Sequence, residues 1–175
     1  MRFGHPNSLP TGGTLPVDHA SVVAFMNEAS LQLGIKLPHT PATVYTFGDS
    51  PTLADELLSL VIAGQKTATT DWPAQPRNWG SGDLHVILDG AARPAALVRS
   101  KEAVEKKFLD VDDTFAWEEG GGDRSLSNWR KDYSAFWKRG DNGSDWNDNE
   151  KVLCEKFEVI LVGPGRGWFG DHGDK

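Results

Sequence analysis

One short segment combines an amine with three hydroxyls: residues 64–70, with the sequence GQKTATT. The segment follows an apolar stretch with helical spacing that ends at Gly64. A lysine partly shielded from water loses some of its preference for the charged form, so Lys66 could act as a base toward a threonine hydroxyl. The same pattern is also typical of a strand start, where threonine is common. Spacing alone leaves both interpretations open.

The three threonines are not equivalent if this segment is extended. Alternation along a strand places Lys66, Ala68 and Thr70 on one face, and Thr67 and Thr69 on the other. Lys66 and Thr69 can therefore meet only if the backbone bends just after the helix.

An acidic pair supplies a second candidate group. Glu118 and Glu119 lie at the end of a predicted short helix, just before three glycines. A carboxylate there could exchange a proton or keep a neighbouring lysine charged. These effects compete, because a nearby carboxylate raises a lysine pKa whereas burial lowers it. The alternative is an ordinary solvated helix end.

The loop that follows, residues 120–125 with the sequence GGGDRS, precedes another predicted helix. Its backbone amides could surround an anion, with Arg124 as a planar fork for phosphate. Asp123 opposes anion binding, and a plain helix cap at Ser125 is the alternative.

The elements that must position these residues can be read from the spacing of apolar residues and from turn signals. We expect helices at 17–33 (ending at Gly34), 51–64 (capped by Ser50), 111–118 and from Ser125 onward. We expect strands at 84–88, 94–98 (extended as far as 108) and 152–162, with a hairpin at Asp89 and Gly90. Helices combined with several antiparallel strands indicate an α+β fold on a small sheet or barrel.

The composition indicates one soluble domain. The chain has 175 residues, of which 38% are hydrophobic and 25% charged. No apolar run approaches the ~20 residues that span a bilayer, so we expect no membrane partner. The first 16 residues do not resemble a secretory signal, the single Cys154 permits no internal disulfide, and the histidines lack metal-ligand spacing. We therefore predict a cytoplasmic protein without metal or cofactor.

The charge distribution bears on possible partners. The net charge of −7 argues against tight nonspecific binding to duplex nucleic acid. Only four of the 18 Lys and Arg residues precede residue 91, so a local basic face would suit a single strand or a nucleotide. Trp72 and Trp79 could stack on a base or belong to the core, whereas Trp129 and Trp137 fit the buried stripe of a helix.

Several segments in consistent order resemble the ASCH domain, a PUA-like family linked to RNA. They are residues 47–51 (FGDSP), 54–57 (ADEL), 64–69 (GQKTAT), 82–83 (GD), 118–120 (EEG), 122–126 (GDRSL), 129–130 (WR) and 152–157 (VLCEKF). The resemblance implies a PUA-like β-barrel over 43–162 with flanking helices. It also implies an N-terminal helical extension over 17–42, between a flexible lead-in (1–16) and a flexible tail (163–175).

The resemblance also implies a chemistry. Small relatives deacylate N4-acetylcytidine with a lysine, a threonine three residues later and a glutamate. Lys66, Thr69 and Glu119 match these as general base, nucleophile or supporting hydroxyl, and proton-handling partner. Residues predicted to bind substrate are Thr67, Thr70, Trp72, Arg124, Ser125, Arg130 and Tyr133.

Another relative cleaves single-stranded RNA with a lysine, a tyrosine and a serine. The turn before Lys66 carries no tyrosine, so Tyr133 would have to substitute from elsewhere, with Ser125 as the serine. We therefore expect a hydrolase acting on a modified nucleoside or on single-stranded RNA. A non-catalytic RNA-binding module, or a domain that binds a small ligand or a protein, remains the alternative. The oligomeric state stays open.

Overall fold

The computed structural model describes residues 2–3, 14–74 and 76–164. Most of the predicted lead-in and tail lie outside these residues. The helices are α1 (Ala20–Leu33), α2 (Pro51–Ile62), α3 (Asp113–Glu119) and α4 (Leu126–Lys138), with 3-10 turns η1 (Phe108–Asp110) and η2 (Gly143–Asp145). The strands are β1 (Arg2–Phe3), β2 (Thr43–Phe47), β3 (Ala68–Asp71), β4 (Leu84–Leu88), β5 (Pro94–Lys107) and β6 (Lys151–Val162).

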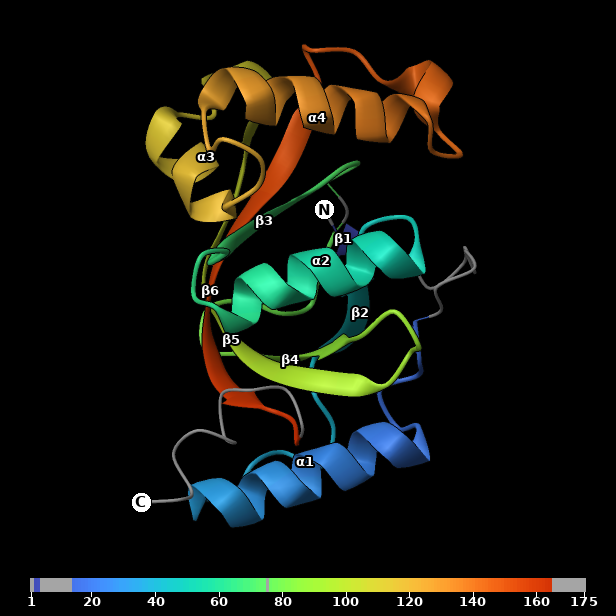
Figure 1. Cartoon of the computed structure of the whole chain (residues 1–175), viewed down its shortest axis with the longest axis vertical. Coiled ribbons are helices and arrows are strands. Elements are labelled where there is room, and N and C mark those ends of the chain that lie inside the picture. Colours follow the sequence, from blue (N-terminus) through green and yellow to red (C-terminus); the bar gives the residue numbers. More distant parts are fainter. Residues whose placement is uncertain (1, 4–13, 75, 165–175) are drawn as a thin grey trace.

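The strands form one curled sheet in the order β1-β2-β4-β5-β6-β3. The long strands β5 and β6 pair along almost their whole length and connect the two ends of the molecule (Figure 1). The predicted antiparallel pairing is confirmed for β4 with β5 and for β5 with β6, whereas β2, which the sequence did not reveal, runs parallel to β4. Parallel strands need a long crossover, and here α2 and β3 lie between them in the chain.

The helices cover different parts of this sheet. Figure 1 shows α3 and α4 at one end, α1 at the opposite end and α2 across the middle. The helices bury apolar faces in three clusters: α3 and α4 share one, which contains Trp129, whereas Met26 of α1 lies in a second and Leu58 of α2 in a third. Burial of such side chains contributes about 1.5–3 kcal/mol each to folding. The sheet is thus enclosed, and the end under α3 and α4 carries the predicted catalytic segment.

Helix α1 ends where the sequence predicted but begins three residues later. Gly34 ends it in the left-handed conformation (φ 65°), which glycine adopts without a steric penalty. At the other end, the His19 ring accepts a hydrogen bond from the Ser21 amide and acts as the N-cap. Histidine is not among the common capping residues, which is why the sequence did not reveal this boundary.

Helix α2 confirms the predicted start at Pro51. The Ser50 hydroxyl accepts a hydrogen bond from the Leu53 amide at 3.1 Å, and proline occupies the first helical position, where its missing N–H costs nothing. After the helix, Gly64 has a φ of 75° and reverses the chain. The Lys66 amide then bonds back to the Leu60 carbonyl at 3.0 Å. This turn fixes the direction in which Lys66 leaves the helix.

The remaining elements follow the predicted pattern closely. β4 spans the predicted residues, and Ser125 caps α4 by accepting from the Asn128 amide at 3.1 Å. In the described part of the chain, no helix is both long and apolar enough to cross a bilayer. The architecture is α+β: four helices around a curled half-barrel of five strands, the PUA-like fold, with β1 added at one edge of the sheet.

Candidate active site

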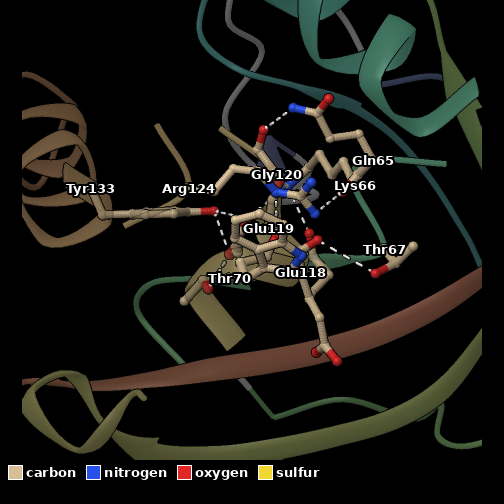
Figure 2. Close-up of polar contacts among 11 residues, drawn as sticks. Gln65, Lys66, Thr67, Thr70, Glu118, Glu119, Gly120, Arg124 and Tyr133 are labelled. Carbon is tan, nitrogen blue, oxygen red and sulfur yellow. Dashed lines mark hydrogen bonds and ion pairs between the residues drawn. The ribbon is translucent and has the colours of Figure 1, made fainter. Parts of the chain in front are cut away.

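Lys66 and Glu119 form a buried ion pair beneath α3 and α4 (Figure 2). The Nζ atom of Lys66 lies 2.6 Å from Oε2 of Glu119, and the residues are 1% and 4% exposed. Nζ also donates to the carbonyl oxygen of Ala68 at 2.7 Å. A buried charge is tolerated only when it is paired and hydrogen-bonded, so each partner depends on the other.

Two backbone segments are docked edge to edge to create this pair. The Thr67 amide donates to the Glu118 carbonyl at 2.8 Å, and the Gln65 side chain donates to the Gly120 carbonyl at 2.7 Å. Gly120 ends α3 with a φ of 79°, and a Cβ there would lie 2.6 Å from the Gln65 carbonyl oxygen. Glycine at this position therefore permits the close approach that brings Glu119 to Lys66.

Two hydroxyls complete the surroundings of the Glu119 carboxylate. Thr70 of β3 donates to Oε1 at 2.5 Å, and Tyr133 of α4 lies 2.8 Å from both carboxylate oxygens. Figure 2 shows the Tyr133 side chain pointing at Glu119 from the side opposite Lys66. One carboxylate thus accepts from three side chains carried by three different parts of the fold.

These contacts change how the site titrates. Burial by itself would raise the pKa of Glu119, but the Lys66 charge and the hydrogen bonds from Lys66 and Thr70 outweigh burial and lower it. Burial, together with the Glu119 charge, raises the pKa of Tyr133 well above its usual value. Glu119 is therefore ionised near neutral pH, while Tyr133 keeps its proton and acts as a donor.

The neighbouring acidic residue belongs to a different environment. Figure 2 shows the Glu118 carboxylate directed away from the cluster. It pairs with Lys156 of β6 at 3.0 Å, and the hydrogen bond with Glu118 raises the pKa of Lys156. Of the two candidate glutamates, only Glu119 lies beside Lys66.

The threonines obey the strand alternation predicted from the sequence. Lys66 and Thr70 both reach Glu119 from one side of the chain. Thr69 is fully buried opposite Glu155 in the ladder between β3 and β6, and alternation directs its side chain to the other face of β3. The Thr67 hydroxyl lies 3.5 Å from the Glu118 carbonyl. Of the three threonines, it is therefore Thr70 whose hydroxyl contacts the Glu119 carboxylate.

The other residues predicted to bind substrate have mainly structural contacts. Trp72 packs against Trp146 and Trp137, with ring centroids 5.1 and 6.1 Å apart. Ser125 caps α4, and Arg130 donates to the Leu109 carbonyl at 2.9 Å. Trp79, the other candidate for base stacking, meets the His85 ring edge-on, with ring centroids 4.7 Å apart.

Arg124 lies at the edge of the site. It donates from Nε to the Trp117 carbonyl at 2.9 Å and from Nη2 to the Gln65 carbonyl at 3.3 Å. Sequence reasoning did not single out Gln65, although it sits between the helix-ending glycine and Lys66. It also missed the exposed Trp117, for which the sequence offered only its place two residues before Glu119.

The comparisons with known proteins agree with this architecture. The family model of the ASCH domain matches residues 43–161, well over half of the chain. Protein EF3133 from Enterococcus faecalis V583 superimposes with a TM-score of 0.70 at 24% identity, covering 82% of this chain and 95% of that one. An ASCH domain from Lactobacillus crispatus JV V101 gives 0.67 at 19% identity, with coverage of 79% and 93%.

A search of the curated proteins gave no match. The two crystal structures are similar in fold, and the family model supplies the assignment. The match spans β2 through β6 and therefore includes Lys66, Thr70, Glu119 and Tyr133. The chain belongs to the ASCH domain family, which is associated with RNA.

Proposed function

We propose that this protein is a hydrolase of RNA-linked substrates that uses Lys66 and Glu119 to cleave an amide, such as the N4-acyl group of a modified cytidine. One observation carries the proposal: an amine, a carboxylate and two hydroxyls converge in a buried site. Such convergence of perturbed titratable groups is characteristic of functional sites. The family's association with RNA supports the choice of substrate class.

The pair can handle both protons that amide hydrolysis requires. Transfer of a proton from Nζ of Lys66 to Oε2 of Glu119 leaves a neutral amine and a carboxylic acid 2.6 Å apart. The amine then takes the proton of the attacking hydroxyl as its oxygen bonds to the acyl carbon. The acid protonates the nitrogen that leaves as the C–N bond breaks. Water releases the acyl group from the hydroxyl by the same steps in reverse.

Two threonines compete for the role of that hydroxyl. Thr69 has the three-residue spacing from Lys66 that the ASCH resemblance implies. Thr70 makes the direct contact with Glu119 at 2.5 Å, which holds and polarises the carboxylate. We assign Thr69 the nucleophilic role and Thr70 the positioning of Glu119. A bend that turns Thr69 toward an incoming substrate is required for this assignment.

Deacylation of N4-acetylcytidine by the purified protein tests the proposal. Lys66→Ala and Glu119→Gln should each lower kcat at least about 100-fold, the scale of a lost general acid or base. Lys156→Ala is the matched control, since it removes a lysine that pairs with Glu118 outside the site. Wild-type turnover in a folded Lys66→Ala protein would refute the proposed role of Lys66.

A non-catalytic RNA-binding module is the second candidate, and the family's association with RNA favours it. Such a module would release no acetate and would leave single-stranded RNA intact. Its affinity for RNA would fall steeply with ionic strength, because counterion release drives such binding. Turnover of a small uncharged nucleoside would depend little on salt, so one salt series separates the two candidates.

A further inference from the structure

Trp117 is the one mostly exposed tryptophan in the described part of the chain. It is 56% exposed on the last turn of α3, whereas Trp129, Trp137 and Trp146 are buried. Trp72 and Trp79 are partly buried. Tryptophan is enriched at interfaces, where its indole offers a large apolar face and one N–H donor. The position of Trp117, two residues before Glu119, places this ring next to the candidate active site.

The guanidinium of Arg124 packs against that ring. The centre of its guanidinium lies 3.8 Å from the Trp117 ring centroid, and two of its N–H groups donate to backbone carbonyls. Its φ of 63° is in the left-handed region, which is costly for a residue with a side chain. Backbone strain of this kind is concentrated at functional sites.

The charge of Arg124 is not neutralised by its neighbours in the part of the chain that the structure describes. Asp123 lies beside it in sequence, but its carboxylate accepts from the amide and hydroxyl of Ser125 at 2.9 and 2.6 Å. Those hydrogen bonds lower the pKa of Asp123. Glu118 pairs with Lys156 instead. Arg124 therefore keeps N–H donors and a positive charge for an anion.

Backbone contacts fix Trp117 and Arg124 in place relative to the buried pair. Arg124 bonds to the carbonyl of Gln65, the residue before Lys66, and Trp117 shares α3 with Glu119. A ligand held here would therefore extend directly from the candidate active site.

We propose that Trp117 and Arg124 bind the nucleotide adjacent to the one that reaches Lys66 and Glu119. The indole stacks on its base, and the guanidinium binds the phosphate between the two nucleotides. Base stacking on an aromatic ring is tolerant of sequence, and a planar guanidinium matches phosphate in two-pronged fashion. A single-stranded oligonucleotide is then a better substrate than the free nucleoside. This identification of the substrate rests on the proposed function, although binding itself does not.

Fluorescence anisotropy with a labelled single-stranded RNA hexamer tests the site. Trp117→Ala should weaken binding about tenfold, and Trp117→Phe should restore most of it, because phenylalanine retains a stacking face. Arg124→Gln should also weaken binding and reduce the slope of log Kd against log salt by about 0.7, the value for one phosphate contact. Leu109→Ala, another exposed apolar side chain, and Arg99→Gln, a surface cation paired with Glu158, are matched controls.

The outcomes separate this site from the proposed hydrolysis. RNA binding that is weakened in Trp117→Ala and Arg124→Gln supports the site even if the wild type releases no acetate. The ratio of kcat/KM for an acetylated oligonucleotide to kcat/KM for the acetylated nucleoside should be lower in Trp117→Ala than in the wild type. The proposal would be overturned if the control variants weakened RNA binding as much as Trp117→Ala and Arg124→Gln do. It would also be overturned if the wild type bound no single-stranded RNA, and that result would point to a protein partner for this surface.

Discussion

The Nζ atom of Lys66 lies 2.6 Å from Oε2 of Glu119, although 53 residues separate the two in the chain. Removing one partner of a buried ion pair leaves an uncompensated charge and costs about 3–5 kcal/mol, whereas replacing both is often nearly neutral. The stability of the fold, like the proposed chemistry, therefore depends on the pairing of Lys66 with Glu119.

This dependence predicts strong coupling in a double-mutant cycle. Lys66→Met and Glu119→Gln should each lower the free energy of unfolding by about 3–5 kcal/mol. The double variant should be more stable than the sum of the two losses implies, since no charge is left unpaired. Urea unfolding of the four proteins measures this. Additive losses would show that the pair contributes little as a unit.

The stability should fall in acid because of Glu119. Its folded-state pKa lies below the usual value of 4.5. Its contribution is complete above about pH 4.5, where the carboxyl is ionised in both states, and is lost as pH falls toward the folded-state pKa. The free energy of unfolding, measured from neutral pH downward, should show this decline. Glu119→Gln should lack that part of it, and an unchanged profile in the variant would contradict the assignment.

Tyr133→Phe isolates one of the donors to Glu119. The ring packs between Trp129 and Trp137, with centroids 4.8 Å from each, and phenylalanine preserves that packing. Loss of a hydrogen bond to a charged group should cost about 1.5–3 kcal/mol and raise the pKa of Glu119. The loss of stability in acid should then begin at a higher pH. Tyr45→Phe, which changes the chain's other tyrosine, should not alter the pH at which this loss begins.

The two threonines should respond differently to the same substitution. Thr70→Val removes the hydroxyl that bonds to Glu119, so it should lower kcat and also move the loss of activity in acid to a higher pH. Thr69→Val should lower kcat without moving that pH, because its hydroxyl acts on the substrate. Steady-state rates across pH measure both effects. Full activity in Thr69→Val would transfer the nucleophilic role to Thr70.

Cys154 offers a direct probe of the same region. It pairs with Thr70 in the ladder between β3 and β6, and burial raises its pKa to about 12. Because the thiolate is the reactive form, a thiol reagent near pH 8 should modify the folded protein very slowly. Modification should follow unfolding in urea, and one cysteine makes the signal unambiguous. Rapid labelling of the folded chain would show that this strand opens locally.

The amino-acid sequence by itself determined the features that depend on neighbours a few residues away. Ser50 with Pro51, the helix-ending Gly64 and the Ser125 cap are all local hydrogen-bond or backbone signals, and each lies where it was expected. The alternation that groups Lys66 with Thr70 is equally local. The family resemblance added Glu119 as a partner for Lys66, which spacing alone could not provide.

The tertiary structure alone decided which distant groups meet. Tyr133 reaches Glu119 because α4 packs across the end of the sheet, and β2 pairs parallel with β4 through a long crossover. The exposure of Trp117 and the uncompensated charge of Arg124 likewise follow from how α3 docks against the segment before β3. Such contacts depend on the packing of elements formed by remote stretches of chain. No local pattern of residue types encodes the distance between them.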